Sequence, residues 1–168
     1  WHAAAPSFAV RNAAFLEAAD DLLLTAARRA LARAGLGAVD VDHVVTVSST
    51  GIATPSLEAR LAERLRLRAD VVRTPIFGLG CGGGVMGLGR AATLARAEPG
   101  CRVLLLVVEL CTLALRLEDR SPANLVACAL FGDGAGAAVI GTNGVGPALR
   151  ATGEHRWADT PDGMGWGD

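Results

Sequence analysis

The chain has 168 residues, of which 51% are hydrophobic and 21 are glycine, which is enough for one domain with a buried core. Sixteen basic residues stand against seventeen acidic ones, so the net charge is -1 and the isoelectric point is near 6.3. Nucleic acids and anionic membranes attract an excess of basic side chains, and this balance therefore argues against both as partners.

The four cysteines, at positions 81, 101, 111 and 128, form no C-x-x-C pair. We therefore expect no metal site and no dithiol chemistry, and a reduced, cytoplasmic location. The longest apolar run, residues 103–108, is far shorter than the roughly 18 residues that span a membrane. For Cys101, Cys111 and Cys128 we expect small buried apolar side chains.

In the first part of the chain, apolar residues recur every three or four positions over residues 11–34, which predicts an amphipathic helix that ends near Gly35. Residues 43–49 then predict a buried strand. In the helix that follows we expect Thr54 as the N-terminal cap and Pro55 in the first helical position. The apolar positions of this helix are the leucines at 57, 61 and 65.

The rest of the chain continues to alternate between strands and helices. We expect these elements in order: strand 71–77, helix 85–97, strand 102–109, a short helix 121–130, a turn at Asp133 and Gly134, and strand 135–141. Because strand 102–109 is apolar almost throughout, it should be covered on both faces. The sequence therefore predicts an α/β domain with a mostly parallel sheet.

Small residues recur at every fourth position along helix 85–97 and just before it, at Gly83, Gly87, Ala91 and Ala95. Such a ridge lets another backbone pack closely. We expect it to face a second helix of similar character. Because the chain has no matching glycine-rich helix, that partner would be another subunit or a further part of the polypeptide.

Cys81 lies in a run of glycines between strand 71–77 and helix 85–97. A thiol at the first turn of a helix faces unpaired backbone N–H groups and the positive end of the helix dipole, and both favour the thiolate. The surrounding glycines leave room for an acyl group to approach the backbone. We therefore predict that Cys81 is a nucleophile.

The same loop also has glycines at 78, 80 and 83, the pattern of a dinucleotide-binding turn, with Glu109 as a candidate ribose-binding acid. Three observations weigh against this alternative. Glu109 lies 26 residues after Gly83, rather than about 20. Pro75 interrupts the strand, and a phosphate-binding loop gains nothing from a reactive cysteine at its centre.

Several separate motifs occur in the order that one protein family has. They are Arg73-Thr-Pro-Ile-Phe-Gly-Leu-Gly-Cys-Gly-Gly-Gly, Val108-Glu-Leu-Cys-Thr, Ser121-Pro-Ala-Asn-Leu-Val and Leu130-Phe-Gly-Asp-Gly-Ala, with Thr50-Gly-Ile-Ala-Thr-Pro-Ser and Met164-Gly-Trp in support. Together they resemble a bacterial type III polyketide synthase of the chalcone and stilbene synthase family. The resemblance runs from Trp1 to the end of the chain.

This resemblance implies the thiolase-like fold, in which two similar βαβ halves bring their central helices together. Residues 1–168 would form the N-terminal, nucleophile-bearing half, as a layered α/β/α fragment that is incomplete at both ends. The family's catalytic histidine and asparagine would lie beyond Asp168, because His2, His43 and His155 lack the expected sequence context. We therefore expect the isolated fragment to be inactive and the intact enzyme to be a homodimer.

The resemblance also implies roles for individual residues. Cys81 would take an acyl group from acyl-CoA, and the acyl group would then be extended by decarboxylative condensation with malonyl-CoA, without a permanently bound cofactor. Phe131 matches the gatekeeper phenylalanine between the coenzyme A tunnel and the reaction cavity. Thr54 would reach across the dimer into the neighbouring site. The remaining substrate-binding positions by this match are Ser49, Thr50, Gly80, Cys111 and Ala114.

Three alternatives stay open at this stage. A ketoacyl synthase III relative would use the same nucleophile but accept acyl carrier protein. A dinucleotide-binding module would bind NAD without acylation, and a truncated scaffold would do neither. The starter unit, the number of extensions and the cyclisation mode depend on the volume of the cavity and do not follow from these residues.

Overall fold

The computed structural model describes residues 6–116, 118–144, 146–155 and 157–159. Its strands are β1 (His43–Ser48), β2 (Val72–Phe77), β3 (Val103–Leu110) and β4 (Asp133–Ile140). Its helices are α1 (Phe8–Ala34), α2 (Leu57–Leu65), α3 (Gly83–Ala97) and α4 (Pro122–Leu130), with short 3-10 turns η1 (Ala38–Asp40), η2 (Gly80–Gly82) and η3 (Cys111–Ala114). None of the helices in the described ranges is long and apolar enough to cross a membrane.

The four strands form one sheet in the order β2-β1-β3-β4. β1 pairs in parallel with β2 and β3, whereas β4 runs antiparallel to β3. The prediction of a mostly parallel sheet is therefore confirmed. The predicted turn at Asp133 and Gly134 is wrong, because both residues belong to β4, where they lie opposite Leu110 and Glu109 of β3. Pairing with the last residues of β3 holds them in an extended conformation.

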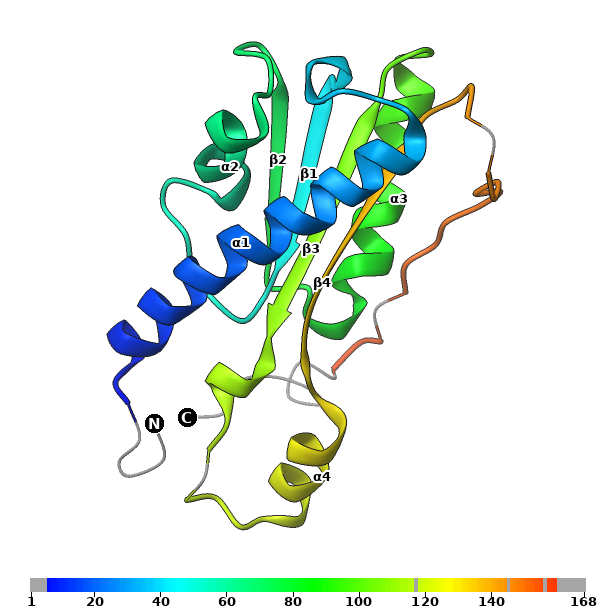
Figure 1. Cartoon of the computed structure of the whole chain (residues 1–168). Helices are drawn as coiled ribbons and strands as arrows, with labels where there is room; N and C mark the ends of the chain where they lie inside the picture. Colours follow the sequence, from blue (N-terminus) through cyan, green and yellow to red (C-terminus); the bar gives the residue numbers. More distant parts are fainter. Residues whose placement is uncertain (1–5, 117, 145, 156, 160–168) are drawn as a thin grey trace.

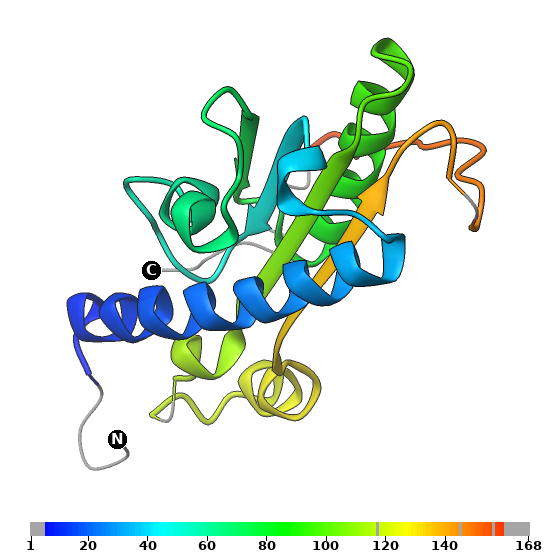
Figure 2. The same ribbon diagram turned by 45° about the horizontal axis from the view of Figure 1, so that its top comes forward.

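Helices cover both faces of the sheet, as Figures 1 and 2 show. On one face α1 crosses the strands, and α2 packs beside it; Phe15, Leu23 and Leu61 are fully buried in this cluster. On the other face α3 packs on β1 and β3. The α/β/α layering that the family resemblance implied is therefore present.

The N-terminus of α2 differs from the prediction. Ser56, not Thr54, occupies the cap position, and Thr54 and Pro55 lie outside the helix, joined by a cis peptide bond. The extended backbone of Ser56, with φ -60° and ψ 158°, places the first helical residue at Leu57. The leucines at 57, 61 and 65 are all buried, as the pattern predicts.

The small-residue ridge of α3 packs on the sheet and not on another helix within the described residues. A Cβ atom added at Gly87 would lie only 2.6 Å from Cγ2 of Val47 in β1 and 3.1 Å from Cδ1 of Leu105 in β3. Ala91 and Ala95 are buried in the same cluster. The expectation that the ridge needs a second helix is therefore wrong: branched side chains on the strands fill the space that the small residues leave.

After β4 the chain returns along α3. Arg90 of α3 forms an ion pair with Glu154, with Nη1 and Oε1 2.6 Å apart. Arg96 donates a hydrogen bond of 2.7 Å to the carbonyl oxygen of Leu149. The segment that follows β4 is therefore attached to α3 by polar contacts.

Candidate active site

Cys81 lies in the η2 turn, between the end of β2 and the start of α3. This is the edge of the sheet at which the parallel strands β1, β2 and β3 end, here called the carboxyl edge (Figure 1). The side chain of Cys81 is exposed. Gly80, which precedes it, has φ +57°, a left-handed conformation that glycine adopts without a Cβ clash. The predicted strand-to-helix junction is thus present, with the thiol in a short turn just before α3.

Ser49 connects this turn to the centre of the sheet. It follows β1 and is buried, and its hydroxyl oxygen accepts a hydrogen bond of 3.0 Å from the backbone N–H of Gly80. Its own N–H donates to Oε1 of Glu109 at the end of β3, over 2.8 Å. The residue next to Cys81 is therefore held in place through β1 and β3 together.

The Glu109 carboxylate is the centre of this hydrogen-bond network. It accepts from Ser49, from the hydroxyl of Thr50 over 2.7 Å, and more weakly from the hydroxyl of Ser48 over 3.5 Å. The Thr50 oxygen in turn accepts 2.9 Å from the N–H of Leu110. Both carboxylate oxygens are engaged in holding the ends of β1 and β3, which argues against a role for Glu109 in binding a ribose.

This bracing role of Glu109 was not predicted from the sequence. The available signal was an acidic residue near the end of an otherwise apolar strand. A carboxylate that leaves bulk water in this way requires hydrogen-bond donors. Those donors are at positions 48–50, and Ser49, for example, lies 60 residues before Glu109 in the chain. No local sequence pattern connects them.

Cys111 and Ala114 lie in η3, directly after β3, and both are half-buried. Burial is the main cause that raises the pKa of the Cys111 thiol, and the negative charges of Glu109 and Asp133 add to it. Cys81 also contributes to raising this pKa, so the two sulfurs share one neighbourhood. Cys111 is therefore suited to be a neutral wall beside Cys81.

Phe131 and Thr54 lie at the same edge. Phe131 follows the last residue of α4 as its C-terminal cap, two residues before β4 begins beside the end of β3, and it is 46% exposed. Thr54 is exposed in the connection that leaves β1 for α2. All the predicted site residues thus lie in segments at the carboxyl edge. Ser49 contacts Gly80 directly, and Thr50 is connected to Ser49 through the Glu109 carboxylate.

None of the other three cysteines is fully buried, so the expectation of buried apolar side chains is wrong for Cys128 and only partly met by half-buried Cys101 and Cys111. Cys128 is exposed on α4, as are its apolar neighbours Leu125 and Leu130, because no described residue covers this side of the helix. Cys101 is half-buried and lies just before β3, at the opposite edge of the sheet from Cys81.

Of the histidines, the structure places His43 at the edge of the sheet opposite to Cys81. His43 begins β1 and is buried, with Nε2 3.0 Å from Oε2 of Glu98. The ring of His155 contacts that of Trp157 at a centroid distance of 4.7 Å. His2 and the Met164-Gly-Trp motif lie outside the described residues.

Comparisons with known proteins identify the family. Residues 2–144 match the family model of the N-terminal domain of chalcone and stilbene synthases. A 1,3,6,8-tetrahydroxynaphthalene synthase from Streptomyces peucetius subsp. caesius is 49% identical over 165 residues, or 95% of this chain. The crystal structure of the tetrahydroxynaphthalene synthase from Streptomyces coelicolor A3(2), a bacterial type III polyketide synthase, is similar with a TM-score of 0.90 and 33% identity over 95% of this chain.

A further solved structure, that of CsyB complexed with CoA-SH, has a TM-score of 0.76 and 29% identity, and the match covers 82% of this chain and 39% of CsyB. This chain spans 44% of the length of the Streptomyces peucetius relative and 46% of the Streptomyces coelicolor structure. The matching family model is not that of a dinucleotide-binding domain. In addition, the Glu109 carboxylate, the candidate ribose-binding group, already accepts a hydrogen bond from Thr50. By sequence and by fold, this chain belongs to the chalcone and stilbene synthase family.

Proposed function

We propose that this chain carries the nucleophile of a type III polyketide synthase and that Cys81 accepts the starter acyl group from an acyl-CoA. One observation carries the proposal: an exposed thiol in a glycine turn at the carboxyl edge, in a chain of this family. The complex of CsyB with CoA-SH supports coenzyme A as the carrier.

The proposed reaction has two steps. In the first, the Cys81 thiolate attacks the thioester carbonyl of the acyl-CoA, and the carbon–sulfur bond to coenzyme A breaks, so that coenzyme A leaves as a thiol after taking up a proton. In the second, malonyl-CoA loses carbon dioxide, and the resulting enolate attacks the Cys81 thioester. The Cys81 thiolate is released again, and the product is an extended acyl-CoA.

The residues around Cys81 have supporting roles in this proposal. The backbone N–H groups at the start of α3 and of Cys81 itself would stabilise the oxyanion that forms in each step. Ser49 and Glu109 hold the Gly80 turn in register with the sheet. The positions proposed to line the cavity or gate its entrance are Thr50, Thr54, Cys111, Ala114 and Phe131, with exposed Thr54 reaching a second subunit of a homodimer.

We further propose that residues 1–168 alone do not extend a polyketide. Stabilisation of the malonyl-derived enolate requires the family's catalytic histidine and asparagine. His43 is buried at the other edge, and His155 is not followed by the Pro-Gly that the family motif has, so neither matches the catalytic histidine. The enzyme would act in the cytoplasm, where its thiols stay reduced.

The test is acylation of the full-length protein by a starter acyl-CoA, followed by mass spectrometry of the cysteine-containing peptides. We expect one acyl adduct, on Cys81, which is lost in Cys81→Ala and retained in Cys128→Ala, the matched variant of another exposed thiol. An adduct that persists in Cys81→Ala contradicts the proposal. Loading from acyl carrier protein but not from coenzyme A would instead favour a ketoacyl synthase III-like enzyme.

A further inference from the structure

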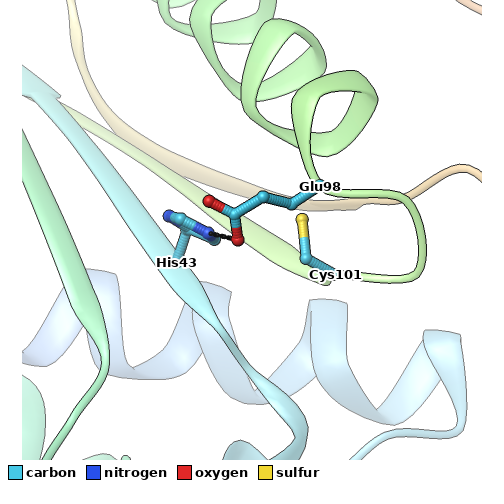
Figure 3. A group of neighbouring side chains, drawn as sticks. All are labelled: His43, Glu98 and Cys101. Atoms are coloured by element: carbon cyan, nitrogen blue, oxygen red, sulfur yellow. Dashed lines mark hydrogen bonds and ion pairs between the residues drawn. The ribbon is translucent and has the colours of Figure 1, made fainter.

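Three side chains with metal-binding atoms converge at the edge of the sheet opposite to Cys81, here called the amino edge (Figure 3). His43 begins β1, Glu98 follows the last residue of α3, and Cys101 precedes β3. One nitrogen, one oxygen and one sulfur atom from these residues all lie within 4.8 Å of one another. None of the three belongs to the candidate active site.

His43 is held firmly in this cluster. Its side chain is 5% exposed, and Nε2 lies 3.0 Å from Oε2 of Glu98. Its backbone N–H donates to the carbonyl oxygen of Arg102, and its neighbours across the sheet are Val72 and Val103. Nδ1 is buried without a hydrogen-bond partner in the described part of the chain, so Nε2 is the ring nitrogen that serves the cluster.

Glu98 and Cys101 are linked by a tight turn, in which the N–H of Cys101 donates to the carbonyl oxygen of Glu98 over 3.0 Å. The Cys101 sulfur makes only a long contact of 3.9 Å with the carbonyl oxygen of Leu94, which a stronger partner would replace. The Glu98 side chain is 63% exposed and can therefore adjust its position. The two side chains point toward the same space as the His43 ring (Figure 3).

The mixture of donor atoms indicates which metal the cluster would take. Imidazole nitrogen, thiolate sulfur and carboxylate oxygen together suit zinc, whereas magnesium and calcium prefer oxygen alone. Tetrahedral zinc would place these atoms about 3.3 to 3.6 Å apart. The present separations reach at most 4.8 Å, so the longest of them would have to shorten by about 1 Å when zinc binds.

Two acidic side chains, Glu98 and Asp42, lie near the Cys101 thiol, and Asp42 is already paired with Arg68. From the donor set and the distances, we propose that His43, Glu98 and Cys101 bind one Zn²⁺ ion, with water in the fourth position.

The proposed ion would join the start of β1, the end of α3 and the start of β3. Because it lies at the amino edge, it would stabilise the fold and take no part in the chemistry at Cys81. No acceptor among the described residues orients the ring through His43 Nδ1, and such partners typically contribute about 10- to 100-fold to metal affinity. Zinc binding should therefore be weaker than at sites that have this partner.

The experiment uses the full-length protein, freed of metal with a chelator and kept reduced. We expect one equivalent of Co²⁺ to produce a thiolate-to-cobalt charge-transfer band, which Zn²⁺ then abolishes. Cys101→Ser should remove this band and weaken zinc binding by at least about 100-fold, since a direct ligand contributes no less than a second-shell partner. Glu98→Gln, at an exposed side chain, should weaken binding without disturbing the fold.

Cys128→Ser is the matched control, because it removes an exposed thiol far along the chain on α4 and should leave the cobalt band unchanged. Circular dichroism identifies any variant that fails to fold, and Glu98→Gln then serves in place of Cys101→Ser. A band of equal size in Cys101→Ser, equal zinc affinity in Glu98→Gln, or no stoichiometric cobalt binding by the parent protein would overturn the proposal. Acylation of Cys81 is measured separately and decides only the proposed enzymatic function.

Discussion

On one face of the sheet, α1 and α2 contribute large side chains such as Phe15, Leu23 and Leu61, each of them fully buried. On the other face, the ridge of α3 contributes only glycine and alanine, and the branched side chains come from β1 and β3. Large side chains separate a helix from a sheet, whereas a ridge of small ones lets the backbones come close. The face that carries α3 therefore places a backbone turn, that of Cys81, tightly against the sheet.

Of the variants that test this difference between the two faces, Phe15→Ala should lower the free energy of unfolding the most. The Phe15 ring is fully buried between α1 and the chain after β1, where a Cβ atom added at Gly51 would overlap it. Its removal leaves a cavity on the large-residue face, and we expect the free energy of unfolding to fall by about 3 to 5 kcal/mol. Chemical denaturation measures this change, and a loss below about 1 kcal/mol would show that the face does not depend on large side chains.

Gly87→Ala tests the opposite face. Although alanine favours a helix over glycine by about 1 kcal/mol, its Cβ would lie 2.6 Å from the stiff Val47 side chain. We expect a net destabilisation of about 1 to 3 kcal/mol from overpacking, measured by chemical denaturation.

Gly84→Ala is the matched control on the same helix. A Cβ atom there would lie 3.7 Å from Cγ1 of Val107, which is an ordinary van der Waals contact. This variant should gain stability, by up to about 1 kcal/mol, through the better helix propensity of alanine. If both variants change stability in the same direction, close approach at Gly87 does not explain the ridge.

Much of this architecture follows from local sequence signals. The helix that ends at Gly35, the buried strand at 43–48 and the glycine turn of Cys81 each have a pattern within a few neighbouring residues. No such local pattern shows whether the α3 ridge faces the sheet or another helix, because small residues pack equally well against a neighbouring helix and against a sheet with branched side chains. The positions of Val47 and Leu105 against the ridge decide between the two arrangements.

Two polar clusters were unpredictable for a similar reason. The donors to Glu109 lie about 60 residues earlier in the chain, and His43 lies 55 residues before Glu98. No spacing rule connects residues so far apart, because strand order alone brings them together. The cysteine count likewise gave no indication that Cys101 would lie beside a histidine and an acid.

Glu109→Gln tests whether hydrogen bonds, rather than packing, keep the Cys81 turn on the α3 face. An amide has one acceptor oxygen in place of two, so it cannot accept all the bonds that Ser49 and Thr50 donate. We expect a loss of about 1 to 3 kcal/mol in the free energy of unfolding, with slower acylation of Cys81 in single-turnover assays. Parental values of both quantities would show that Ser49 holds the turn without this carboxylate.

The smallest expected effect is on the alkylation rate of Cys111, which lies after β3 at the carboxyl edge of the sheet. Burial and nearby negative charge raise its pKa above the ordinary value of 9.0, so its thiolate fraction at pH 7 is smaller than that of an ordinary cysteine. Alkylation needs the thiolate and should therefore be slow at neutral pH and accelerate as pH rises past 9. Peptide mass spectrometry follows the rate, with exposed Cys128 as reference. Equal labelling of both at pH 7 would contradict this expectation.

The strand that leads into the Cys81 turn has a further consequence for engineering this protein. β2 lies at the margin of the sheet, and Val72 and Phe77 are 50% and 61% exposed. These two side chains bury little apolar surface, so substituting them carries a low risk of unfolding the protein. Positions 72 and 77 are therefore sites where random variants can be screened for altered reactivity at Cys81 while the protein still expresses in folded form, whereas Ile76 packs against the core.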